Sequence, residues 1–126
     1  IRQLIGDTKF NDYLKNFYNS GKNKSITYAQ FQASNTKYLG KKYAKLLEWY
    51  ITNSQLPTIQ YKKTKNGVYI RWDVTKLSNI AIPIEVQHIT RDVSLSNTWQ
   101  KIAPSAPNIE IKLAKPYLLF NLQQIR

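Results

Sequence analysis

The side chains that most often carry catalysis are scarce in this chain. It has one histidine, His88, and no cysteine. A catalytic zinc site carried on a helix needs two histidines one turn apart with a glutamate between them, and a thiol nucleophile needs a cysteine. Neither can be assembled from these residues. We therefore interpret His88 as a strand-surface or edge residue, and we expect no catalytic, cofactor-binding or metal-ligating residue in the chain.

The acidic residues do not suggest a general acid–base pair either. They are spread along the sequence at Asp7, Asp12, Glu48, Asp73, Glu85, Asp92 and Glu110. We interpret Asp7 as a helix cap. A pair of carboxylates brought together by folding is the alternative that the sequence leaves open. With four glycines in all, the chain has no glycine-rich loop of the kind that holds phosphate.

Aromatic and basic residues are abundant. The chain has three tryptophans, nine tyrosines and four phenylalanines, and its formal net charge is +12. We predict that Trp72 and the helical aromatics belong to the core or to a contact between domains, with a stacking platform for a ligand as the alternative. The charge suggests either a solvated basic surface or a binding module for nucleic acid or an acidic membrane. Scattered lysines and a total of four arginines argue against nucleic acid, and no apolar run is long enough to cross a membrane.

The first 55 residues show helical periodicity. Residues 1–5 are predicted to form the last turn of a helix that ends at Gly6, and Asp7 then caps the next helix. Apolar side chains follow at helical spacing, at Phe10, Tyr13, Leu14 and Phe17.

Two further helices are predicted before residue 56. Thr27 and Gln30 have the spacing of a capping box, so a helix should begin there and end near Gly40. Another helix follows Gly40. Pro57 ends the helical part, because its ring restricts the preceding residue to extended conformations.

From residue 56 onward the apolar period changes from 3.6 to 2, which indicates strands. Asn66-Gly67 predicts a hairpin turn in which both residues accept positive φ. Pro83 and Pro116 are expected at strand starts or edges, where a missing amide costs little. Further strands are predicted at residues 82–89, 93–95, 99–102, 109–113 and 118–122. The predicted fold class is α+β: about three helices in residues 1–55, then an antiparallel β-sandwich of about six to seven strands in residues 56–126.

Four motifs occur in a telling order. They are Leu4-Ile5-Gly6-Asp7 with Phe10, Tyr28-Ala29-Gln30-Phe31, Leu39-Gly40 through to Trp49-Tyr50, and Leu56-Pro57 through to Tyr61. Together they resemble the C-terminal part of zinc aminopeptidases of the aminopeptidase N family. Looser likenesses to bacterial members follow at Arg71-Trp72, Ile82-Pro83-Ile84 and Thr98-Trp99. Lys42 departs from the pattern, because the family usually has Asp there, and any contact of that Asp is in doubt here.

The resemblance implies that residues 1–55 finish the helical part of a thermolysin-like catalytic domain and that residues 56–126 form a β-sandwich domain. In that family the zinc ligands and the substrate-binding loop precede the matched region, so none is carried over to this chain. We therefore expect a non-catalytic fragment without a cofactor of its own. Zinc belongs to the parent enzyme, and peptide substrate is reached only through that parent.

The partner expected from the resemblance is the missing catalytic domain. The absence of methionine fits an origin in a longer polypeptide. Apolar surface left uncovered by that origin would allow the fragment to self-associate. The likeness to bacterial members favours the bacterial cytoplasm or periplasm. The alternative function is a stand-alone basic module that binds an anionic partner.

Overall fold

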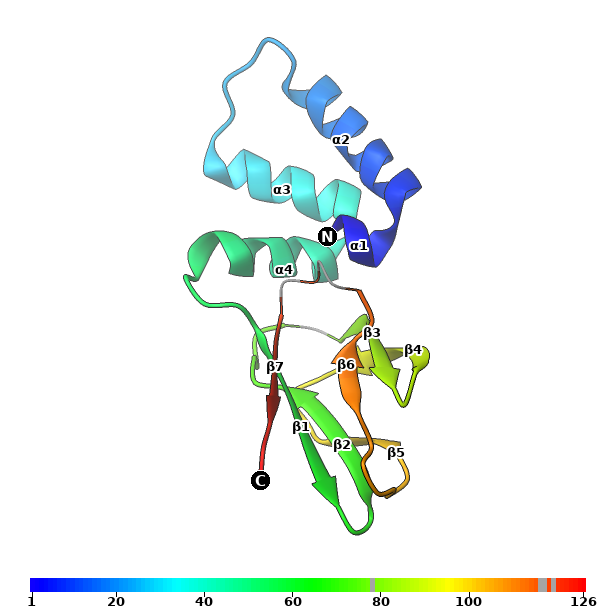
Figure 1. Ribbon diagram of the computed structural model, residues 1–126. Coiled ribbons are helices and arrows are strands. Elements are labelled where there is room, and N and C mark those ends of the chain that lie inside the picture. Colours follow the sequence, from blue (N-terminus) through cyan, green and yellow to red (C-terminus); the bar gives the residue numbers. More distant parts are fainter. Residues whose placement is uncertain (78, 116–117, 119) are drawn as a thin grey trace. The chain divides into compact units, whose positions relative to one another are not determined.

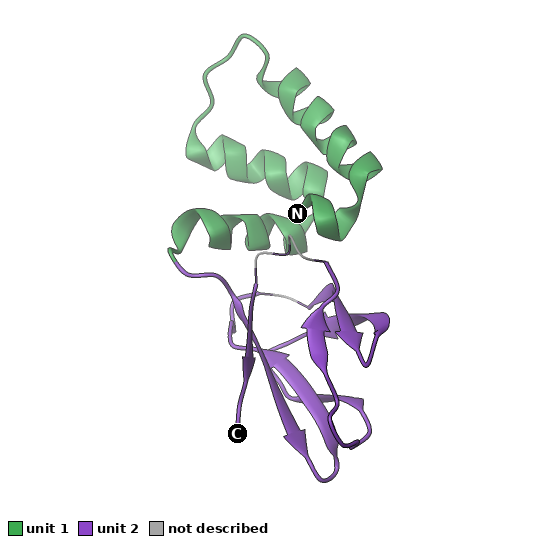
Figure 2. Cartoon of the chain, in the orientation of Figure 1, with its two compact units in different colours: residues 1–54 green, residues 55–126 purple. Residues whose placement is uncertain are grey.

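The computed structural model describes residues 1–77, 79–115, 118 and 120–126. The chain divides into two compact units, residues 1–54 and 55–126 (Figure 2). Helices come first and two sheets follow (Figure 1), so the predicted α+β class is confirmed. In the described part of the chain, none of the helices combines the length and apolar character that crossing a bilayer requires.

The helical unit contains four helices among the residues that the structure describes. They are α1 (Arg2–Ile5), α2 (Asp7–Gly21), α3 (Tyr28–Leu39) and α4 (Lys41–Thr52). Two glycines join them in pairs: Gly6 between α1 and α2, and Gly40 between α3 and α4. Both have φ +86°, with ψ 164° and 157° respectively. Because L side chains rarely adopt this φ, each one-residue junction depends on glycine.

The start of α3 is fixed by the predicted capping box. The backbone N–H of Gln30 donates to Thr27 Oγ1 at 3.2 Å, and the backbone N–H of Thr27 donates to Gln30 Oε1 at 2.8 Å. The cap predicted at Asp7 is wrong. Gly6 is the N-cap of α2, and the Asp7 carboxylate instead accepts a 2.7 Å hydrogen bond from Arg2 Nε.

An aromatic row joins α2 to α3. Ring centroids are 6.1 Å apart for Phe10–Tyr13 and for Tyr13–Phe17, and 5.7 Å apart for the edge-on pair Phe17–Phe31. Beneath this row, the buried Tyr13 hydroxyl donates to Asn35 Oδ1 at 2.6 Å. The helical spacing of aromatics in the sequence thus becomes a contact between two helices.

The β unit contains seven strands in the described residues. They are β1 (Thr58–Thr64), β2 (Gly67–Trp72), β3 (Ile80–Val86), β4 (Ile89–Leu95), β5 (Gln100–Ala103), β6 (Ile111–Leu113) and β7 (Asn121–Gln124). One sheet has the order β5-β2-β1-β7 and the other β4-β3-β6. All pairs are antiparallel except β1 with β7, which is parallel. Of the predicted strand 118–122, residue 119 lies outside the described residues, as does Pro116.

Alternating apolar residues on both sheets form the core of this unit. Ile59, Ile70 and Trp72 are fully buried on the first sheet, and Ile82 and Ile84 on the second. Trp72 stacks on Phe120, with centroids 6.5 Å apart. The prediction that Trp72 is a core residue is confirmed.

The first hairpin turn lies one residue earlier than predicted. Thr64 pairs with Gly67, so the turn residues are Lys65 and Asn66. Neither turn residue has a positive φ, whereas Gly67 has φ 141°. A Cβ on Gly67 would lie 2.6 Å from the carbonyl oxygen of Ala103 and from Lys101 Cε. Gly67 is therefore required by the close approach of β5 rather than by a type I′ turn.

Pro83 was expected near a strand start or edge, and that is wrong: it lies in the middle of β3, the central strand of its sheet. Its carbonyl accepts a 3.0 Å bond from the Ala114 N–H, just past the end of β6. A residue's N and O lie on the same side of a strand, so the missing amide falls where β6 has ended. The one bond that proline cannot make therefore lies at the end of the β3–β6 ladder.

Candidate functional site

The single histidine lies in a hairpin turn, which corrects the predicted strand 82–89. Gln87 and His88 have φ of 49° and 66° and separate β3 from β4. The His88 side chain is 80% exposed, and its Nδ1 is 3.6 Å from Glu85 Oε1. Such a turn needs positive φ at both residues, and glycine or asparagine usually marks it in a sequence. Neither residue type occurs at these two positions, so the sequence did not predict the turn.

Three of the acidic residues contact other groups of the chain. Asp7 contacts Arg2, Glu110 contacts Lys112 at 3.0 Å, and Asp73 accepts the backbone N–H of Thr58 at 3.1 Å. Within the described residues, no three His, Cys, Asp or Glu side chains gather in an arrangement that could hold a metal ion.

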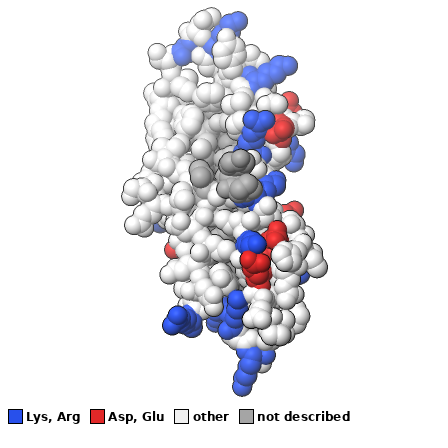
Figure 3. All heavy atoms as spheres, in the orientation of Figure 1, with Lys and Arg blue, Asp and Glu red and all other residues white. Residues whose placement is uncertain are grey.

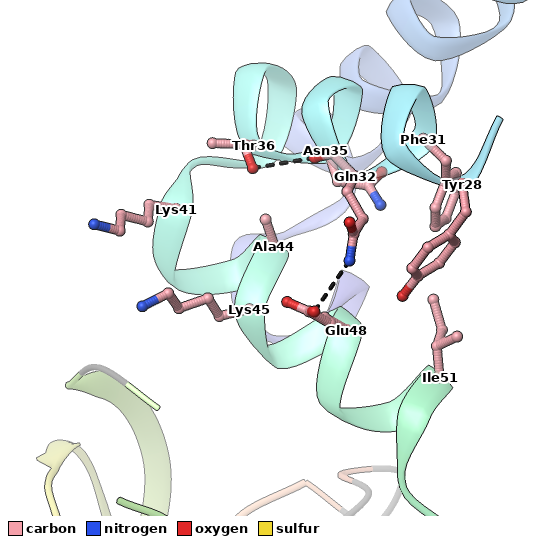
Figure 4. A pocket seen from close by; sticks show the side chains of 10 residues that line it. All are labelled: Tyr28, Phe31, Gln32, Asn35, Thr36, Lys41, Ala44, Lys45, Glu48 and Ile51. Atoms are coloured by element: carbon pink, nitrogen blue, oxygen red, sulfur yellow. Dashed lines mark hydrogen bonds between the residues drawn. The ribbon is translucent and has the colours of Figure 1, made fainter. Parts of the chain in front are cut away.

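A pocket of about 300 Å³ lies between α3 and α4 in the helical unit (Figure 4). Glu48 is its one acidic group, and Oε1 of that residue accepts a 3.0 Å hydrogen bond from Gln32 Nε2. The pocket is lined by Tyr28, Phe31, Gln32, Asn35, Thr36, Lys41, Ala44, Lys45, Glu48 and Ile51. The pocket is a largely apolar cleft with one carboxylate held by an amide and two lysines at its rim, and its lining offers no nucleophile–base pair.

Two tyrosines of the helical unit titrate above their ordinary range. Burial raises the pKa of Tyr13 above 10, and burial raises the pKa of Tyr50 to about 12. In both cases burial disfavours the phenolate, so the phenol keeps its proton to a higher pH than an exposed tyrosine does. Tyr13 uses its proton in the bond to Asn35.

The most organised cluster of charged and aromatic groups lies on one face of the first sheet. We name it the Trp99 face and define it by Gln60, Lys62, Tyr69, Arg71 and Trp99. Cross-strand pairing sets Gln60 opposite Arg71 and Lys62 opposite Tyr69. Because side chains alternate along a strand, these four share the face opposite the buried Ile59 and Ile70.

Trp99 gathers both cations of this face. Lys62 Nζ lies 4.4 Å and Arg71 Cζ 4.5 Å from the centroid of the Trp99 ring. Arg71 Nε also donates to Gln60 Oε1 at 2.9 Å. Both cations therefore make cation–π contacts with one indole ring. The ring and Gln60 together fix the plane of the Arg71 guanidinium.

Lysine and arginine are otherwise widely spread. Figure 3 shows blue side chains at many points of the visible face and red ones in small groups. Sequence reasoning missed the Trp99 face, because it placed Trp99 only at the start of the predicted strand 99–102 and assigned its side chain no contact. Pairing of Lys62 with Tyr69 could have been found from the hairpin, but the approach of Trp99 depends on β5 pairing with β2 from a distant part of the chain.

The comparisons with known proteins assign no family, because the chain matches no protein-family model and no curated protein.

Proposed function

We propose that this chain is a non-catalytic C-terminal part of a zinc aminopeptidase-like metallopeptidase, in which it supports the catalytic domain and its cleft. The observation that carries the proposal is the order of motifs along the chain, together with the elements on which they fall. Leu4-Ile5-Gly6-Asp7 spans the first glycine junction, Tyr28 follows the N-cap residue Thr27, and Leu39-Gly40 spans the second junction. Leu56-Pro57 then leads into β1.

The exposed apolar side chains of α2 and the loop after it give this proposal a surface for the catalytic domain. Leu14 is 46% exposed, Tyr18 64% and Ile26 43%. They line a groove of about 640 Å³. Exposed apolar groups gathered in one place are typical of a surface that another element covers. In the proposal, helices of the parent's catalytic domain cover it, and the fragment by itself self-associates through it.

The test begins with the gene from which the chain comes. The proposal requires a His-Glu-x-x-His segment upstream of Ile1, and the whole protein should bind zinc and hydrolyse an aminoacyl p-nitroanilide. Ending the whole protein at residue 55 of the present numbering should lower that activity, while zinc content per molecule is retained. An upstream region without the two histidines would refute the proposal. So would chelator-sensitive hydrolysis by the purified 126-residue chain alone.

A matched pair of charge substitutions tests the α2 groove. Leu14→Glu places a carboxylate in the groove, whereas Asn16→Glu makes the same change of charge at an exposed residue of the same helix outside the groove. Light scattering of the 126-residue chain should show less self-association for Leu14→Glu than for Asn16→Glu. Equal behaviour of the two variants would remove the groove from the proposal.

A further inference from the structure

The Trp99 face carries positive charge that the chain itself does not neutralise. In the part of the chain that the structure describes, neither Lys62 nor Arg71 takes part in an ion pair. The ion pairs found there join Arg2 to Asp7, His88 to Glu85 and Lys112 to Glu110. Lys101 adds a third cation to the same face, because it stands opposite Tyr69 in the register of β2 with β5.

The three cations are spaced by the sheet. Lys62, Tyr69 and Lys101 lie in one row across β1, β2 and β5. Neighbouring strands are about 4.8 Å apart, so the backbones that carry the two lysines are about 10 Å apart. Arg71 lies two residues along β2 from Tyr69, on the same face. The charges therefore cover a compact area rather than a long track.

Arg71 is oriented before any ligand arrives. Its Nε is occupied by Gln60 Oε1, and its guanidinium carbon lies 4.5 Å from the centre of the Trp99 ring. A guanidinium held in this way keeps its two terminal nitrogens as a fork that fits the two oxygens of a carboxylate. Little side-chain entropy is lost when such a fork binds.

We propose that the Trp99 face is a docking site for an acidic polypeptide segment, whose carboxylates bind Arg71, Lys62 and Lys101. Charge complementarity carries the proposal, and the composition of the face agrees with it. Trp, Tyr and Arg are the residues that dominate the energetics of protein–protein interfaces. The inference does not depend on the proposed function, because it concerns only the β unit's own residues.

A polypeptide fits this face better than a nucleic acid does. Single-strand binding relies on open aromatic rings on which bases stack, whereas the Trp99 ring is already engaged by two side chains of its own chain. Gln60 on β1 pairs with Arg71 of β2 on one side and with Gln123 of β7 on the other, so two amide side chains extend the row of Arg71 across the sheet. Amides donate and accept, as peptide groups do, while phosphodiester oxygens only accept.

The experiment measures fluorescence anisotropy of a labelled peptide with the 126-residue chain. The probe is an extended peptide with glutamate at alternate positions, which sets carboxylates about 7 Å apart on one side. The control probe has glutamine in place of each glutamate. We expect binding of the acidic probe only, with affinity that falls as NaCl rises from about 50 to about 200 mM.

The matched variants are Lys62→Gln and Lys63→Gln, which remove the same charge from adjacent residues on opposite faces of β1. Arg71→Gln and Lys62→Gln should each weaken binding about tenfold, since each removes a charge-assisted bond, and Lys63→Gln should change it less than twofold. Trp99→Leu should weaken binding by loss of the platform under Arg71. Circular dichroism of each variant separates loss of binding from loss of fold.

Several outcomes overturn the proposal. One is an equal loss for Lys62→Gln and Lys63→Gln, which would mean that net charge alone attracts the probe. Another is tighter binding of a single-stranded oligodeoxythymidylate, or of phosphatidylserine vesicles, than of the acidic peptide at the same salt. The absence of peptide binding at low salt by a folded chain overturns it as well.

Discussion

Replacing Tyr13 by phenylalanine tests whether one buried hydrogen bond holds α2 on α3. The Tyr13 hydroxyl donates to Asn35 Oδ1 over 2.6 Å, and the two residues are 7% and 3% exposed. The ring contacts with Phe10 and Phe17 remain in the variant, so the change removes the hydroxyl and little else. Asn35 is then left as a buried polar group without this donor.

The expected cost follows from that unpaired group. Leaving a buried acceptor unsatisfied costs about 1–3 kcal/mol, more than the net worth of an ordinary hydrogen bond. A unit of 54 residues has a free energy of unfolding of about 3–8 kcal/mol at typical stability per residue. The variant should therefore lose a large fraction of the stability of the helical unit. Tyr18→Phe on the same helix, where the ring is 64% exposed, should change it by less than about 0.5 kcal/mol.

The assay is urea unfolding followed by circular dichroism at 222 nm, which reports the helical unit. Asn35→Ala and the double variant complete a thermodynamic cycle with Tyr13→Phe. Because both single changes break the same bond, the double variant should cost at least about 1 kcal/mol less than the sum of the two. Strict additivity of the two changes would refute the reasoning.

The same residue gives a prediction about pH. Burial raises the pKa of Tyr13 above its ordinary value of 10. Below pH 10 the phenol is protonated in both states, so its contribution is fully present. As pH rises beyond 10, the unfolded chain loses the proton first, and stability falls. Tyr50, whose pKa burial raises to about 12, adds to this fall in both proteins. The stability of Tyr13→Phe should therefore fall less steeply above pH 10 than that of the natural chain, and parallel curves would contradict the assignment.

Three further substitutions test other parts of the fold. Gly67→Ala should destabilise the β unit by about 1–3 kcal/mol in thermal unfolding, because the added Cβ would lie 2.6 Å from the Ala103 carbonyl oxygen. Its control is Gly21→Ala, which should be neutral or stabilising in the same assay because no atom lies closer than 4.0 Å to the added Cβ. Thr27→Ala should lower the free energy of unfolding by about 0.5–2 kcal/mol, because it removes the cap of α3. The helical signal should then be lost at a lower urea concentration, and an unchanged urea midpoint would count against the capping box. Trp72→Ala should lower the free energy of unfolding by about 3–5 kcal/mol, because it empties a fully buried position. Trp72→Phe should lower it clearly less, because the indole Nε1 that it removes makes no hydrogen bond within the described residues. Chemical denaturation of the two variants gives both values.

The parts of the fold that local chemistry determines could be predicted from the sequence. The Thr27–Gln30 spacing located the start of α3, and Gly40 its end, because caps and positive φ are properties of a few neighbouring residues. The turn at Gln87 and His88 could not be predicted, since neither residue has the φ preference that such turns usually exploit. The place of Pro83 depends on where β6 ends, which is a tertiary fact.

The site shows the same limit. Sequence inspection placed Trp72 correctly in the core, because it alternates with other apolar residues of β2. For Trp99 it gave a place in a predicted strand and no contact. Trp99 meets Lys62 and Arg71 only after β5 pairs with β2, and the bulge between Val68 and Tyr69 shifts that register. The alternation of a strand predicts which residues share a face, but not which other strand lies beside them.

The parallel pairing of β7 with β1 has a consequence for synthesis on the ribosome. Tyr61 bonds Gln124, which follows it by 63 residues. At about 5–20 residues per second, that stretch takes about 3–13 seconds to be made. During this time one long side of β1 has no neighbour to take its backbone hydrogen bonds, and a nascent strand in that state can pair with another chain. Lys62 and Lys63 within β1 are the kind of residue that opposes such pairing, so they would protect the emerging polypeptide against aggregation before β7 is translated.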